Sequence, residues 1–298
     1  MTVSQITHEG FSDESNWNKG RFRSLSLVTL PVRFVAASEK DLRALLTNSS
    51  VSEFKWNELR TAKDRFAALK LCNFAVKAAC VRKLRVDVLV WDIADSRHHL
   101  PGRDDIGNLQ RMYYHLFRNV LRARWPDDCV WRLHPDEHTA MDWQTVHDYL
   151  TSGSRTLDFE GSLFTPGGFR ARLRREFAVE QIVPATSGDY CLLQLADLFA
   201  GLAVFSREQH DAYIQQISAS DPQTLLFDEG DDELEVSRSV SERCFVLQAF
   251  DDACKKHGLG VSLRSQKGLW TPTPANPLNF WLYKPQGEYD KAPRRRVT

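Results

Sequence analysis

The chain has 298 residues, of which 39 are basic and 39 acidic, and its pI lies near 7.1. This balance excludes a bulk positive field of the kind that attracts nucleic acid or anionic membranes, so an anionic substrate has to be bound by a local group of side chains. The six cysteines are dispersed without a C-x-x-C pair and the first residues lack a signal-peptide pattern, which together predict a cytoplasmic protein.

The first part of the chain predicts strands followed by helices. A short strand at 6–11 leads into acidic residues, and residues 21–35 predict two further strands hinged near Pro31. A helix is expected to begin at Ser38, and a longer one covers 64–84, where apolar residues recur at helical spacing. The first strands therefore form a meander.

The middle of the chain alternates strands and helices. Residues 86–93 are a continuous apolar run, typical of a parallel strand that is covered on both faces, and Asp92 stands near its end. A helix over 108–124 and a strand at 129–133 follow, and that strand leads into Asp136. This order indicates right-handed crossovers and a mostly parallel sheet behind the meander.

The segment Tyr190–Ser206, YCLLQLADLFAGLAVFS, is apolar almost all the way round at helical period, which predicts a buried helix. It is too short, and too interrupted by Asp197, to span a bilayer. Gln194 and Asp197 lie three residues apart and therefore on one face. Because a buried carboxylate is costly without a partner, Asp197 is either a structural acid, satisfied by backbone donors or an arginine, or one of several acids that bind a metal ion.

Acids follow the predicted strands at Asp13, Asp92 and Asp136, and Asp197 lies in a helix that follows a strand. Ligands of open α/β sheets collect beyond the carboxyl ends of the strands, so we expect these carboxylates at one edge. An all-carboxylate set suits Mg²⁺ or Mn²⁺, and two such ions can cleave a phosphodiester. Taken singly, Asp92 and Asp136 are better explained as turn formers, and only the four acids together favour a metal site.

A rival zinc site is suggested by HPDEH at 134–138, which matches the H-x-x-E-H pattern of zinc peptidases. That chemistry requires a helix, which Pro135 disfavours. Positively charged and aromatic side chains could instead bind a phosphate and stack on a base, although a solvated surface explains them equally well. These candidate substrate contacts are Lys55, Trp56, Arg170 and Arg172.

The acids and their flanking motifs resemble the DUF3800 family. The motifs are D-E-S at 13–15, F-K-W at 54–56 and S-G-D-Y-C-L-L-Q-L-A-D across 187–197, within a resemblance that runs from about Gly10 to Phe205. It implies a ribonuclease H-like fold, and members of that family often accompany mobile elements and phage defence. The implied metal ligands are Asp13, Asp136 and Asp197, with Glu14, Asp92 and Lys55 as secondary site residues. Apart from the resemblance, Gln194 stands one helical turn before Asp197 and is expected to support it, as is Ser187, a candidate N-cap of the same helix. One departure is Asn16, where the family has a glycine after D-E-S.

We therefore expect an α/β protein with a ribonuclease H-like domain at 1–207 and a C-terminal helical and irregular elaboration at 208–298 packed on it. The expected activity is divalent-metal-dependent hydrolysis of RNA or DNA. The alternative is a non-catalytic interaction protein that keeps the fold. It would contact a protein partner through the basic run at 170–175 and the C-terminal region.

Overall fold

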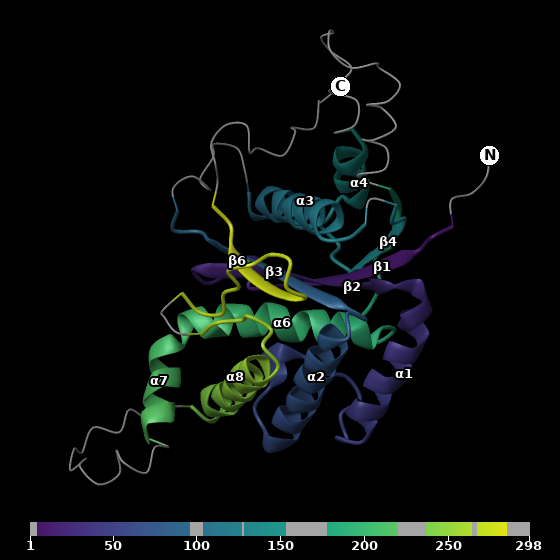
Figure 1. Cartoon of the computed structure of the whole chain (residues 1–298). Helices are drawn as coiled ribbons and strands as arrows, with labels where there is room; N and C mark the ends of the chain where they lie inside the picture. Colours follow the sequence, from purple (N-terminus) through teal and green to yellow (C-terminus); the bar gives the residue numbers. More distant parts are fainter. Residues whose placement is uncertain are drawn as a thin grey trace.

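A six-stranded mixed sheet forms the centre of the molecule in a computed structural model that describes residues 5–95, 104–126, 128–152, 178–219, 237–263 and 267–284 (Figure 1). The strand order is β5-β4-β1-β2-β3-β6. β1, β2 and β3 pair antiparallel, β4 and β5 continue parallel to β1, and β6 runs parallel to β3. This confirms the expected ribonuclease H-like arrangement, an antiparallel meander followed by parallel strands. The strands are β1 (His8–Ser15), β2 (Phe22–Pro31), β3 (Arg85–Asp92), β4 (Trp131–Pro135), β5 (Val179–Ile182) and β6 (Leu278–Leu282).

Helices cover both faces of the sheet (Figure 1). One face carries α3 (Asp105–Ala123) and α4 (Trp143–Ser152), and the other carries α6 (Cys191–Glu208), which packs across β1, β2 and β3. Because both faces are buried, successive residues of β3 enter opposite cores: Val88 and Val90 pack on the α6 side, Leu89 and Trp91 on the α3 side. The outer helices on the α6 side are α1 (Val32–Thr47), α2 (Ala62–Cys80), α7 (His210–Ala219) and α8 (Arg238–Lys256).

The prediction of a buried helix at 190–206 is confirmed. In α6 every residue from Cys191 to Arg207 is buried except Asp197. The helix has no polar face because it lies between the sheet on one side and α1 and α8 on the other. Asp197 is half-buried and is therefore the one residue of this stretch that is not fully enclosed.

Two expectations about secondary structure are wrong. Residues 21–35 form one strand rather than two, because β2 ends at Pro31 and α1 begins at Val32, before the expected start at Ser38. The β-branched and aromatic residues after Pro31 suggested a strand, but Phe34 and Val35 pack against the core from the first turns of α1. The tail from Leu269, expected to be irregular, contributes β6 to the sheet.

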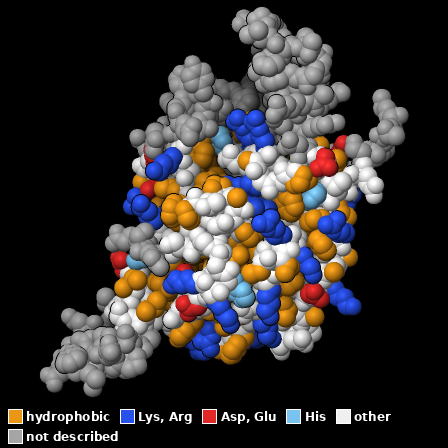
Figure 2. Space-filling model, in the orientation of Figure 1, with side chains coloured by type: hydrophobic (Ala, Val, Ile, Leu, Met, Phe, Trp, Pro, Cys, Tyr) orange, Lys and Arg blue, Asp and Glu red, His pale blue; other side chains and the backbone are white. Residues whose placement is uncertain are grey.

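The charged side chains are scattered over the face of the molecule shown in Figure 2. On the face shown in Figure 2, Lys and Arg side chains are spread over the molecule rather than gathered in one patch, in keeping with the neutral composition. Among the described residues, no helix is long and apolar enough to cross a membrane.

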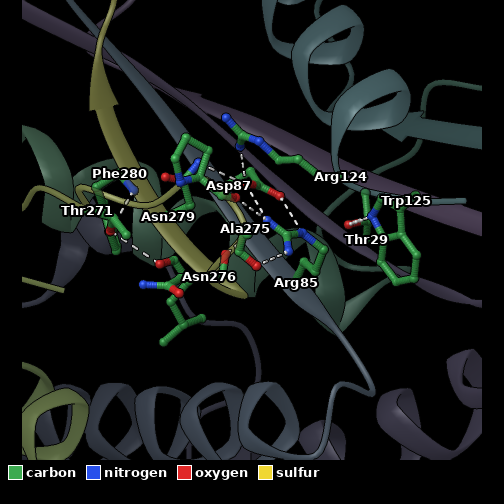
Figure 3. Close-up of polar contacts among 12 residues, drawn as sticks. Thr29, Arg85, Asp87, Arg124, Trp125, Thr271, Ala275, Asn276, Asn279 and Phe280 are labelled. Atoms are coloured by element: carbon green, nitrogen blue, oxygen red, sulfur yellow. Dashed lines mark hydrogen bonds and ion pairs between the residues drawn. The ribbon is translucent and has the colours of Figure 1, made fainter. Parts of the chain in front are cut away.

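A buried ionic network ties the C-terminal segment to the sheet (Figure 3). Asp87 of β3 is fully buried and accepts hydrogen bonds from Arg85, Arg124 and Asn279 of β6. Arg85 also donates to three backbone carbonyls of the loop that precedes β6, those of Pro274, Ala275 and Asn276. Removing one partner of such a network leaves a buried charge uncompensated, so β6 is an integral strand.

Candidate functional site

A pocket of about 320 Å³ opens at the edge of the sheet where β1 and β4 end. Four acids line it, Asp13, Glu14, Asp136 and Asp197, so the structure brings together three strand-end acids and the acid of α6. Other side chains contribute amide, hydroxyl and ammonium groups. Among them are Asn16, Asn18, Lys19, Lys55 and Ser187.

Topology places the acids next to one another. Phe11 and Asp13 share one face of β1, and because Phe11 lies in the core against α6, Asp13 points toward that helix. Asp136 directly follows β4, and its backbone N–H donates to the carbonyl of Ser12 at 2.7 Å. Asp197 lines the same pocket from α6. Each aspartate is thus fixed by a different element.

Burial raises the pKa of the pocket acids, and neighbouring carboxylates raise some of them further. Burial raises the pKa of Asp13 well above its usual value, and the charges of Asp197, Glu14 and Asp136 raise it further. Burial likewise raises the pKa of Asp197 to about 7, with the charge of Asp136 adding to the effect. Clustered carboxylates of this kind are costly to keep unless they serve a function, which makes the pocket a candidate active site.

Glu14 is anchored from the α3 side of the sheet. The hydroxyl of Tyr113 donates to Glu14 Oε2 at 2.6 Å, and His138 Nε2 lies 3.9 Å from Glu14 Oε1. Burial raises the pKa of Glu14 to about 7, while the Tyr113 hydrogen bond opposes that rise. The carboxylate is therefore held in one orientation at the wall of the pocket.

The F-K-W loop, residues 54–56, is attached to α6 by its backbone. The N–H of Trp56 donates to Asp197 Oδ2 at 2.6 Å, and the N–H of Phe54 donates to Gln194 Oε1 at 2.8 Å. Gln194 also donates to the carbonyl of Ser187 at 2.7 Å. No described contact joins Gln194 to Asp197 directly; Gln194 holds the loop and the turn before α6.

Trp56, expected to stack on a base, lines the pocket, but most of its ring is buried in the core. The indole lies over Gly201 of α6, where a Cβ atom would overlap it, and meets Phe205 edge to face. Gly201 thus permits the close approach of the loop to the helix. All three loop residues line the pocket, and Lys55 is the exposed one, with 45% of its side chain accessible.

Two further residues at the site could not be predicted from the sequence. Glu53 accepts a hydrogen bond from the Ser187 hydroxyl at 2.5 Å and lies 3.3 Å from Lys55, and its charge raises the pKa of Asp136. Arg243 of α8 donates to the carbonyls of Trp56 and Asn57 at 3.0 and 3.1 Å. Neither belongs to a motif, and only the tertiary structure places them here.

Other predicted site residues lie elsewhere. Asp92 forms an ion pair with Arg21 at 2.8 Å and does not line the pocket, because β2 separates β3 from β1 in the sheet. Arg170 and Arg172 lie outside the described residues. The zinc-peptidase interpretation of 134–138 fails, because His134 belongs to strand β4 and not to a helix.

The departure at Asn16 does not disturb the turn after β1. Asn16 adopts a left-handed conformation with φ of 58°. Glycine takes this conformation at no cost, and asparagine is among the few other residues that tolerate it. The backbone beside Asp13 and Glu14 can therefore follow the course that a glycine would give it.

The donor set fits a hard divalent ion, since all four acids offer oxygen, the ligand that Mg²⁺ and Mn²⁺ prefer. Within the described part of the chain, no three His, Cys, Asp or Glu side chains are already close enough to hold one ion in common. Binding would therefore require at least one carboxylate to rotate toward the others.

Similar proteins occur in an archaeon. Uncharacterized protein ORF2' of Methanothermobacter thermautotrophicus is 38% identical over 295 residues, which cover 96% of this chain and 97% of that protein. Uncharacterized protein ORF2 of the same organism is 37% identical over the same spans. The chain belongs to the ORF2 family. No family model matches it. The similarity to the ORF2 proteins runs through both the acidic pocket and the C-terminal region, so β6 and α8 lie within the span that the family shares.

Proposed function

We propose that this ORF2-family protein is a divalent-metal-dependent nuclease that hydrolyses phosphodiester bonds in RNA or DNA. The observation that carries the proposal is one pocket, lined by Asp13, Glu14, Asp136 and Asp197, at the carboxyl edge of a ribonuclease H-like sheet. Burial raises the pKa of all four carboxyl groups. The resemblance to DUF3800 supports the same activity and suggests a role in phage defence or mobile-element biology.

Each residue has a role in this proposal. Asp13, Asp136 and Asp197 would hold Mg²⁺ or Mn²⁺, which supplies Lewis acidity and lowers the pKa of bound water. Glu14, held by Tyr113, would orient the ligands or complete the set. Lys55 stands beside Asp136, whose pKa its charge lowers, and would bind a phosphate oxygen of the substrate.

One observation favours a second candidate, a non-catalytic interaction protein with the same fold. Asp197 accepts the N–H of Trp56, which is the kind of partner that satisfies a structural acid. Asp13 likewise accepts the N–H of Glu14 at 2.7 Å, and a backbone hydrogen bond from Glu137 lowers the pKa of Asp136, so each of the three aspartates has one such partner. A structural role does not explain why three aspartate carboxylates line one pocket.

The experiment that separates the two compares wild type with Asp13→Asn and Asp197→Asn for cleavage of mixed RNA and DNA substrates in Mg²⁺ or Mn²⁺. We expect both variants to lose at least roughly a hundredfold in rate, because metal ions supply several kcal/mol of transition-state stabilisation. Asp92→Asn is the matched control outside the pocket and should keep activity within about twofold of wild type. Equal cleavage by wild type and Asp197→Asn, or no cleavage by wild type in either metal, would refute the nuclease.

A further inference from the structure

A second cavity, of about 660 Å³, lies between α3 and the edge strand β6, on the face of the sheet opposite α6. Nothing in the proposed chemistry uses it. We refer to it as the α3–β6 groove. It is lined by His115, Arg118, Asn119, Arg122 and Ala123 of α3 and by Trp281, Leu282, Tyr283 and Lys284 at the end of β6.

The groove is basic. Arg118 and Arg122 stand one helical turn apart on α3, Lys284 lies at the end of β6, and all three are exposed. No acid is among the described residues that line it, and neither Arg118 nor Lys284 forms an ion pair with another described residue. Arg118 and Lys284 are therefore available to bind an anion, and an arginine can donate two parallel hydrogen bonds to a phosphate.

The wall of the groove is rigid. The Tyr283 hydroxyl is hydrogen-bonded to His115 Nε2 at 3.0 Å and accepts from Arg111 at 3.1 Å, and all three side chains are buried. The guanidinium of Arg124 lies 4.4 Å from the centre of the Trp281 ring. A preorganised wall lowers the entropy lost when a ligand binds.

The acidic pocket supplies little of this attraction itself. Its lining holds four carboxylates against two lysines, Lys19 and Lys55, and Lys55 lies 3.3 Å from Glu53. Because the chain has no net charge, affinity for a polyanion has to come from a local group of cations outside the pocket.

We propose that the α3–β6 groove binds the phosphodiester backbone of a single-stranded segment of nucleic acid. The inference rests on the proposed function for the identity of the ligand. Arg118 and Lys284 can neutralise two phosphates of one strand, which is far fewer than the roughly 6 to 10 phosphate contacts of a protein that binds duplex strongly through its charge.

The test measures fluorescence anisotropy of labelled oligo(U) and oligo(dT) of about 16 nucleotides, in EDTA and over a range of salt concentrations. The variant is Arg118→Glu/Lys284→Glu. Its matched control is Lys40→Glu/Lys77→Glu, which makes the same charge change at exposed lysines of α1 and α2, on the other side of the sheet. Circular dichroism of each protein checks that it is folded.

We expect wild type to bind with a dissociation constant of roughly 1 to 100 µM, the range of binding through phosphate contacts. The groove variant should bind at least about tenfold more weakly, and the slope of log K against log salt should flatten by roughly 1.4, the value for two lost contacts to a single strand. The control should change affinity less than about twofold.

Equal losses in the two variants, or no binding by wild type, would overturn the proposal. So would competition by inorganic phosphate or a mononucleotide as effective as that of the oligonucleotide at equal phosphate concentration, which would assign the groove to a small ligand. Because EDTA prevents metal-dependent cleavage, the result does not depend on catalysis. A protein that binds through the groove but never cleaves would refute the nuclease alone, whereas a nuclease whose binding ignores the groove would refute this inference alone.

Discussion

Asp197 has two neighbours with opposite effects on its carboxyl group. The N–H of Trp56 stabilises the carboxylate, while burial and the charge of Asp136 destabilise it, and the second effect is larger because the pKa rises to about 7. A residue that served only to hold the F-K-W loop could be an asparagine, which offers the same acceptor oxygen without a charge. The free energy of unfolding of an Asp197→Asn variant measures this difference.

The metal-free protein should become less stable as the pH rises. The carboxyl group of Asp197 has a pKa near 3.8 in an unfolded chain and about 7 in the folded protein. Between these values the unfolded chain has released the proton and the folded protein still holds it, so the free energy of unfolding falls as the pH rises toward 7. Asp197→Asn removes this effect, and we expect it to raise the free energy of unfolding at pH 8 in EDTA by about 1 to 2 kcal/mol.

Urea denaturation at pH 5 and pH 8 provides the measurement, with Asp92→Asn as control. The ion pair with Arg21 lowers the pKa of Asp92, so its contribution to stability is present at neutral pH and is lost on acidification. The control should therefore be no more stable than wild type at pH 8. If Asp197→Asn is also less stable than wild type at pH 8, Asp197 is a structural acid.

The sequence was enough to propose individual acids as site residues, but it did not show where each side chain lies. Asp13, Asp136 and Asp197 could be proposed because each follows a strand or interrupts an apolar helix. Glu53 could not, because an acid in a polar loop has no distinguishing pattern. The burial of the Trp56 ring was not predicted, because Gly201, over which the ring packs, is far away in the sequence.

Among the elements, α8 has a specific contact with the site although it lies outside the segment that resembles DUF3800. Arg243 joins α8 to the F-K-W loop through the carbonyls of Trp56 and Asn57, and its guanidinium lies 5.3 Å from the centre of the Trp56 ring. Its charge also lowers the pKa of Asp197. The C-terminal region thus helps to position the backbone that carries Lys55.

Arg243→Ala should lower the rate of metal-dependent cleavage by roughly tenfold, because two charge-assisted hydrogen bonds that fix the loop are lost. The expected cost in the free energy of unfolding is about 1 to 3 kcal/mol. Lys256→Ala, at an exposed position near the end of the same helix, is the control and should leave both unchanged. Cleavage by Arg243→Ala at the wild-type rate, measured well below its melting temperature, would show that α8 does not support the site.

Elements whose pattern is local were predicted well, and those that depend on distant partners were not. The apolar period of α6 was enough to predict a buried helix, and the run at 86–93 was enough for β3. β6 escaped prediction because its short segment lies among prolines and becomes a strand only by pairing with β3 and by the contacts of Arg85. α1 begins at Val32 and not at Ser38 as expected, because packing of Phe34 against the core outweighs the local preference for a strand.

For the whole molecule, the order of the strands explains why the acids meet. β4 runs parallel to β1 and next to it, so Asp136 and Asp13 leave the same edge of the sheet as neighbours. β3 also ends at this edge, but β2 stands between it and β1, which is why Asp92 takes Arg21 as its partner instead. A strand-end acid therefore indicates the correct edge, and strand order, which the sequence does not state, decides which acids meet.

A crystal of the wild-type protein soaked in MnCl₂ would show whether the pocket acids hold divalent ions in common. We expect anomalous difference peaks between Asp13, Asp136 and Asp197, with metal–oxygen distances of roughly 2.0 to 2.3 Å and at least one carboxylate rotated toward the ion. If two ions bind, they should lie about 4 Å apart. The absence of any peak in the pocket at saturating Mn²⁺, with the carboxylates still apart, would refute metal binding by these acids.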